Sequence, residues 1–246
     1  MTALALRRFP ALLGYVPRAC LPPRRLAVLA LPCLTILASG LLARAIEGRA
    51  TAGFADAAGL GIFGLAMPLG ALVIGDAVLG AEVRAGTFPF TWLSPVRFPE
   101  LVLARWLGGW LLALATLVPC AGLAAVLTGA PSLAWSVIVA SAAGAAAHIA
   151  LFVLIGCVTR RAAVWSLAVV FVVERLLGAV LSGIAQLSPT WQGRAVFAGL
   201  GDLRDLRRSG IPEGWDAVVR LGLITVACLA LASLGLRRLQ LTGARD

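Results

Sequence analysis

The sequence AEVRAGTFPFTWLSPVRFPELVLARWLGGW, residues 81–110, lies between two long apolar blocks and sets the organisation of the chain. It combines charged and aromatic side chains and is divided by two turn-forming pairs, Gly86-Thr87 and Ser94-Pro95. A short amphipathic helix bracketed by turns between two membrane spans gives a soluble partner a rigid contact. An ordinary interfacial loop, with its aromatic rings among the lipid headgroups, is the alternative interpretation. The pattern by itself leaves both open.

The composition requires a membrane environment. The chain has 246 residues, of which 61% are hydrophobic and 13% are charged, and its mean hydropathy is +0.97. A soluble domain cannot bury so much apolar surface, so lipid must be the main solvent of the folded chain. The five cysteines are scattered without metal-ligand spacing and are interpreted as packing residues, so no metal site is expected.

The charged residues exclude several functions. All 21 basic residues are arginine, and the net charge is +10. Without lysine there is no phosphate-binding Gly-Lys-Ser/Thr loop, so the chain is not expected to hydrolyse ATP itself. The sequence also lacks the H-E-x-x-H and G-x-S-x-G motifs, which disfavours a membrane enzyme. The arginines flank apolar blocks, so membrane topology explains them better than nucleic-acid binding.

The apolar blocks predict an all-α membrane protein with six spans in a single transmembrane domain, residues 1–246. Residues 106–159 form a run of 54 residues without charge. At about 1.5 Å per residue this is too long for one crossing, and the sequence TGAPS at 128–132 divides it. The second block is rich in glycine and is expected to pack inside the bundle. The predicted spans are 26–43, 57–79, 106–128, 133–157, 162–185 and 217–236.

Two segments outside the spans are also predicted to be amphipathic. Residues 1–25 carry five arginines among apolar residues and prolines, which is typical of a basic segment lying on the inner leaflet. A signal peptide is the rival interpretation, but the apolar core at 26–43 is longer than a usual signal core. The polar stretch 186–216 predicts an outer interfacial helix, because one helical face carries Val196, Phe197, Leu200, Leu203 and Leu206.

Four polar residues are candidates for a transport path or for contacts between helices: Asp76, His148, Glu174 and Arg175. A charge at mid-bilayer costs about 2.5–3.5 kcal/mol, so Glu174 and Arg175 should face protein or a polar cavity. Neighbouring residues on a helix lie about 100° apart, so each should reach a different partner. His148 has no carboxylate near it in sequence, which favours a structural hydrogen bond over a proton relay. Asp76 is expected at the cytoplasmic interface.

The distribution of arginine predicts that both termini are cytoplasmic. With this orientation the cytoplasmic pieces hold 13 arginines, the outer pieces hold six, and two lie within spans. The excess inside follows the positive-inside rule. It places residues 82–105 in the cytoplasm and 186–216 outside. The use of arginine alone, together with abundant alanine, indicates a GC-rich bacterial genome and hence a bacterial cytoplasmic membrane.

Glu82-x-x-x-Gly86-Thr87, followed by Leu93-Ser94-Pro95-Val96-Arg97 and an apolar run containing Arg105, resembles the signature of permease subunits in the type-two family of ABC transporters, exporter type. In that family this cytoplasmic segment couples the second and third spans to the ATPase. Pro89 departs from the pattern because it interrupts the expected coupling helix. The coupling residues implied by the resemblance are Glu82, Gly86, Thr87, Phe88, Phe90, Trp92, Leu93, Ser94 and Pro95.

The resemblance also implies partners and a mechanism. Cytoplasmic ATPase subunits would bind ATP and Mg, so no cofactor is expected in this chain. A second permease protomer, identical or a sibling, would complete a transport path that works by alternating access. A secondary transporter or a membrane scaffold that needs no ATPase is the alternative, and in it Glu174, Arg175 and Asp76 would be the functional charges.

Overall fold

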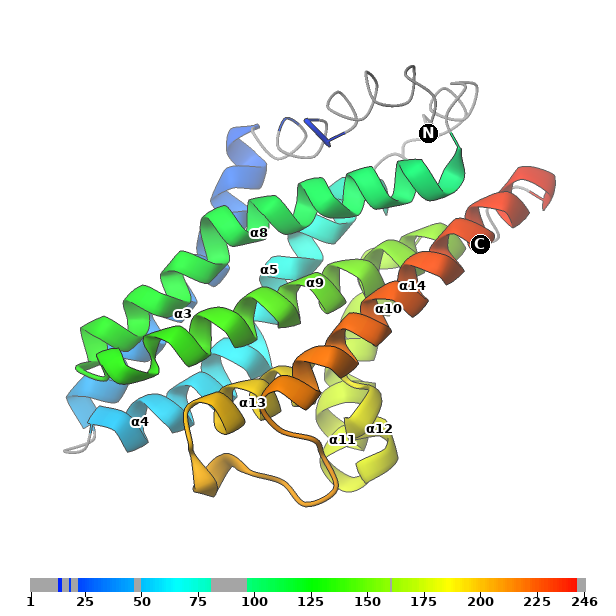
Figure 1. Cartoon of the computed structure of the whole chain (residues 1–246). Helices are drawn as coiled ribbons and strands as arrows, with labels where there is room; N and C mark the ends of the chain where they lie inside the picture. Colours follow the sequence, from blue (N-terminus) through cyan, green and yellow to red (C-terminus); the bar gives the residue numbers. More distant parts are fainter. Residues whose placement is uncertain are drawn as a thin grey trace, which may run out of the picture.

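The computed structural model describes residues 13–14, 18, 22–46, 50–80, 97–159 and 161–242, and within these ranges every regular element is helical (Figure 1). Six of the helices are long and apolar enough to cross a membrane: Arg25–Ala45, Ala50–Leu79, Phe98–Thr128, Pro131–Val158, Ala162–Val180 and Trp215–Arg237. The chain is therefore an all-α, multi-pass membrane protein, as its apolar pattern predicts.

Several crossings are built from more than one kind of helix. The first is α3 (Pro23–Ile46), and the second joins α4 (Ala50–Ala57), the π-helical η1 (Ala58–Ala66), α5 (Met67–Gly75) and the π-helical η2 (Asp76–Gly80). The third is α8 (Phe98–Thr128), and the fourth is η3 (Pro131–Leu133) with α9 (Ala134–Val158). The fifth joins α10 (Ala162–Ala168), the π-helical η4 (Val169–Leu177) and α11 (Gly178–Val180), and the sixth is α14 (Trp215–Thr242).

Helix α9 is the centre of the bundle. It packs against α8, α14, α13 (Pro189–Leu200) and α5, and Figure 1 shows it between α8 and α14. Two tryptophans fix its distance from α8, because Trp106 Nε1 donates to the Ala146 carbonyl and Trp110 Nε1 donates to the Ala142 carbonyl, each at 2.9 Å. Their indole rings stack, with centroids 5.6 Å apart.

Small residues allow the other helices to approach closely, as is common inside membranes. A Cβ added to Gly40 of α3 would lie 2.7 Å from the Ala124 carbonyl oxygen of α8. Thr128 Oγ1 donates across the same contact to the Gly40 carbonyl, at 2.9 Å. The most apolar part of the second crossing is 61% buried, against 28% or less for the first, fifth and sixth. The expectation that the glycine-rich block packs inside the bundle is therefore confirmed.

Three crossings have boundaries that differ from those predicted by five residues or more. The second begins at Ala50 instead of residue 57, because α4 continues directly into η1. The third begins at Phe98 instead of residue 106, because Pro99 suits a first helical turn and Glu100 faces the positive end of the helix dipole. The fifth stops at Val180 instead of residue 185, because Leu181 takes an extended conformation (φ −103°, ψ 111°).

The helical cap, residues 181–214, joins the fifth and sixth crossings. It contains α12 (Ser182–Leu187), α13 and the short 3-10 helix η5 (Arg204–Leu206). In Figure 1 it lies at the end of the bundle opposite the start of α8 and the C-terminal end of α14. Helix α13 is shorter than the amphipathic pattern suggests, because the chain turns at Gly201 and Asp202, where Asp202 has φ 51°.

Two predicted segments are described only in part or not at all. Most of the basic segment at 1–25 lies outside the described residues, and the interval 81–96 lies outside them completely. The structure does describe the residues on either side of that interval, Gly80 at the end of η2 and Arg97 before α8.

Candidate functional site

A buried carboxylate joins the fifth crossing to the cap. Glu174 lies on η4 and is 2% exposed. Its Oε2 accepts hydrogen bonds from Ser188 Oγ at 2.9 Å and from the Thr190 amide at 3.1 Å. Both donors belong to the start of α13, where free amides and the helix dipole favour a negative charge. Glu174 therefore binds the N-terminus of α13 from outside that helix.

The local sequence explains why α13 begins at this point. Ser188 is the residue before the helix, and its Oγ accepts from the Trp191 amide at 3.4 Å. Pro189 follows in the first turn, where its fixed φ and missing amide hydrogen cause no loss. Trp191 adds another connection to η4, since its Nε1 donates to the Glu174 backbone carbonyl at 2.8 Å.

The fourth crossing contributes His148, which is 1% exposed on α9. Its Nδ1 lies 2.9 Å from the Gly144 carbonyl, an acceptor only, so Nδ1 carries hydrogen and donates to it. Its Nε2 lies 3.5 Å from Glu174 Oε2 and 3.3 Å from Thr190 Oγ1. The site thus draws residues from α9, η4 and α13 around one carboxylate oxygen.

This geometry allows two protonation states. With a neutral imidazole, Nε2 accepts a hydrogen bond from the Thr190 hydroxyl. With a protonated ring, Nε2–H faces Glu174 Oε2 and forms an ion pair within the bundle. The second carboxylate oxygen, Oε1, is buried without a hydrogen-bond partner among the described residues. The His148–Glu174 contact is therefore a buried polar link between the fourth and fifth crossings.

The four polar residues predicted from the sequence do not form one group. His148 and Glu174 lie together, although they belong to different crossings. Arg175 turns to another side of η4, where a Cβ on Gly64 of η1 would collide with its Nη1. Asp76 lines a separate small hollow with Phe152 and Ser166. Glu174 and Arg175 thus reach different partners, as helical geometry predicts.

Sequence reasoning missed the cap residues of the site. Ser188, Thr190 and Trp191 supply its hydrogen bonds, yet nothing in the sequence connects them to a carboxylate on η4. The available signal was Ser188-Pro189, a common beginning of a helix. The coupling residues predicted on the cytoplasmic side lie outside the described residues and stay predictions: Glu82, Gly86, Thr87, Phe88, Phe90, Trp92, Leu93, Ser94 and Pro95.

Comparison with known proteins assigns no family to the chain. It matches no protein-family model and no curated protein. A function has therefore to be argued from the residues of this chain and their geometry.

Replacing Glu174 with leucine should destabilise the protein. The substitution leaves the Ser188 hydroxyl and the Thr190 amide without their acceptor and removes the partner of His148. Polar contacts inside membranes contribute about 0.6–1.7 kcal/mol each. A loss of at least about 1 kcal/mol lowers the midpoint of thermal unfolding by about 2–4 °C in a chain of this size. The measurement is thermal unfolding in detergent.

Asp205→Leu is the matched control, because it removes an exposed carboxylate from η5 of the same cap. Its unfolding midpoint should stay at the wild-type value. Equal midpoints for Glu174→Leu and Asp205→Leu would contradict a stabilising role for the buried carboxylate.

Proposed function

We propose that this chain is the permease subunit of an ATP-driven exporter in a bacterial cytoplasmic membrane, and that a separate ATPase docks on residues 82–95. The observation that carries the proposal is the position of this motif-bearing interval. It links Gly80 to Arg97 in the sequence, between the second and third of six apolar crossings, and α8, which follows it, begins at the end of the bundle opposite the helical cap. An enzyme motif is absent from the sequence, so the chemistry of ATP hydrolysis is assigned to the partner.

The geometry around the interval suits the transmission of force. Arg105, on the second turn of α8, is 3% exposed, and its Nη1 donates to the Val78 carbonyl of η2 at 3.1 Å. This bond joins the two helices that flank residues 81–96, so a displacement of the interval would move both. Helix α8 runs without a break for 31 residues, from Phe98 to Thr128 at the other end of the bundle.

The proposed mechanism is alternating access. Binding of ATP brings two ATPase subunits together, and the docked segments move with them. The movement passes along α8 to α9, through the contacts of Trp106 and Trp110. One chain supplies six crossings, which we assign to half of a transporter. A second protomer, identical or a sibling, would supply the other half around a shared path.

A secondary transporter is the second candidate, because one observation favours it. The buried His148–Glu174 contact joins two crossings, and paired ionisable residues inside a membrane are typical of the proton relays of carriers. The two candidates differ in what drives transport. Transport that persists without an ATPase and responds to a proton gradient would identify the chain as a proton-coupled carrier.

The arginine distribution predicts the orientation, with the cap outside and residue 97 in the cytoplasm. Ser209→Cys and Arg97→Cys, both at exposed positions, test it on a background without native cysteines. A membrane-impermeant maleimide added to intact cells should label Ser209→Cys and not Arg97→Cys. Labelling of Arg97→Cys alone would reverse the orientation and remove the proposed dock from the cytoplasm.

Trp92→Ala should weaken docking of the ATPase by about tenfold or more, because buried aromatic anchors commonly contribute 2 kcal/mol or more and about 1.4 kcal/mol is one decade. The measurement is retention of the ATPase that co-purifies with the wild-type chain in detergent, paired with substrate-stimulated ATP hydrolysis. Trp135→Ala is the control, since Trp135 is 64% exposed at the start of α9, at the opposite end of the bundle from the start of α8. Wild-type association and hydrolysis in Trp92→Ala would leave residues 81–96 as an interfacial loop.

A further inference from the structure

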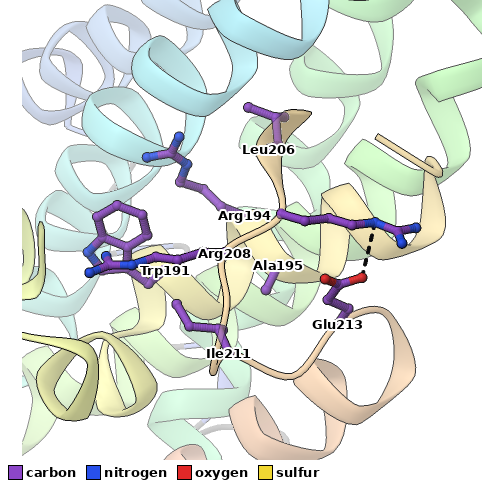
Figure 2. A pocket seen from close by; sticks show the side chains of 8 residues that line it. Trp191, Arg194, Ala195, Leu206, Arg208, Ile211 and Glu213 are labelled. Atoms are coloured by element: carbon purple, nitrogen blue, oxygen red, sulfur yellow. Dashed lines mark ion pairs between the residues drawn. The ribbon is translucent and has the colours of Figure 1, made fainter. Parts of the chain in front are cut away.

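Guanidinium groups gather around Trp191 at the cap (Figure 2). The Cζ of Arg194, on α13, lies 4.8 Å from the centroid of the Trp191 ring. The Cζ of Arg208, which follows η5, lies 4.5 Å from the same centroid. Arg208 also donates to the carbonyls of Gly178 and Ala179, at 2.7 and 2.8 Å, at the end of the fifth crossing. The indole is therefore a platform for two cations.

The second crossing leaves room for this group. A Cβ on Gly59 of η1 would lie 3.2 Å from Arg194 Nη2, and a Cβ on Gly64 would collide with Arg175 Nη1. The guanidiniums of Arg194 and Arg175 thus rest on two glycines of the same π-helix. Arg175, Arg194 and Arg208 are called the arginine cluster below.

The three arginines of the cluster form no ion pair with the nearby acids. Over the described part of the chain, no carboxylate oxygen lies within 4.0 Å of a nitrogen of these three arginines. Glu174, next to Arg175, turns to His148 and α13. Glu213, in the same groove, pairs with Arg207 at 3.1 Å (Figure 2). The positive charge of the cluster is therefore available to an external anion.

Arg194 is the member of the cluster whose charge would be stabilised most by such an anion. Its Nε is buried and has no hydrogen-bond partner within the described ranges. Burial lowers the pKa of its guanidinium first, and the charges of Arg175 and Arg208 lower it further, while Asp56 acts in the opposite direction. Like charges held together without a counter-ion raise the free energy of the fold. An oxyanion at this place would offset that repulsion and supply the missing acceptor.

The surroundings indicate the kind of molecule that carries the anion. The groove between α13 and the segment after η5 has about 10 Å³ of free space, room for about one water-sized group. It therefore admits an oxygen of a headgroup lying at its mouth and excludes a whole buried substrate. Two large apolar side chains of this part of the chain are exposed, Val180 (77%), next to Ala179, and Leu187 (72%), at the end of α12. They offer a surface for an acyl chain.

We propose that the arginine cluster binds the phosphate group of an anionic amphiphile at the membrane surface that carries the cap. Arginine suits this role because its planar group binds phosphate oxygens through two parallel hydrogen bonds. Arg194 and Arg208 contact the oxyanion, and the acyl chain lies along the apolar residues near Val180 and Leu187. Binding of the amphiphile at the cap requires no ATPase.

The test measures binding of short-chain lipids to the full-length protein in a neutral detergent, without any ATPase. The probes are dioctanoyl phosphatidylglycerol, dioctanoyl phosphatidylcholine and inorganic phosphate. Phosphatidylglycerol should bind at least tenfold more tightly than either of the others, and Arg194→Gln should remove most of that advantage. Arg204→Gln is the control, because it deletes the same charge from an exposed position on η5 of the same cap. Its binding should equal that of the wild type.

Three results would overturn the inference. Equal binding of phosphatidylglycerol to wild type and Arg194→Gln would exclude the cluster as the site, and equal binding of the two lipids would exclude recognition of the anionic headgroup. Inorganic phosphate that competes as tightly as the lipid would show a phosphate site with no role for the acyl chain. If Arg194→Gln does not fold, Arg208→Gln replaces it, and the comparison of lipids on the wild-type protein decides by itself. Failure of ATPase docking would leave all these results unchanged.

Discussion

The Glu174 carboxylate is the constraint on which the cap depends. A charge inside an apolar bundle is tolerated only where protein groups replace water around it. In this bundle they come from Ser188 and Thr190 at the start of α13 and from His148 of α9. The same contacts that make the charge tolerable also fix where α13 begins and how it meets the fourth crossing. Solvation of one side chain thus positions the helix that carries Trp191 and Arg194.

The two ends of the bundle carry different polar groups. At the cap end lie the buried His148–Glu174 contact and, beside it, an arginine cluster that forms no ion pair with a carboxylate of the described residues. The opposite end holds Arg105, which joins the helices on either side of the interval 81–96. Helix α9 packs against helices that reach both ends. A transporter needs such a path between a driven end and a substrate-facing end, and this is why the permease proposal and the lipid site suit the same bundle.

The sequence predicts the number and order of the crossings well, because each helix that crosses the lipid needs a long run of apolar residues. It predicts their ends less well. The charges of Glu100 and Arg105 favour a start of the third crossing at residue 106, although both fit within a helix that starts at Phe98. The pairing of His148 with Glu174 depends on tertiary packing between separate crossings, which a single sequence does not encode locally. The sequence locates the cap between the fifth and sixth crossings but does not predict the helices within it. The turns at Leu181 and Asp202 that separate these helices depend on backbone conformation.

Hydrogen–deuterium exchange of α13 tests the central claim most directly, because the claim is that the charge of Glu174 holds the start of this helix. Glu174→Gln keeps the shape of the side chain and removes its charge. Peptides covering residues 188–200 should exchange faster in this variant than in the wild type, while peptides from α8 at 111–127 should exchange at the wild-type rate. Unchanged exchange at 188–200 would show that packing alone holds the cap and that the buried carboxylate does not position α13.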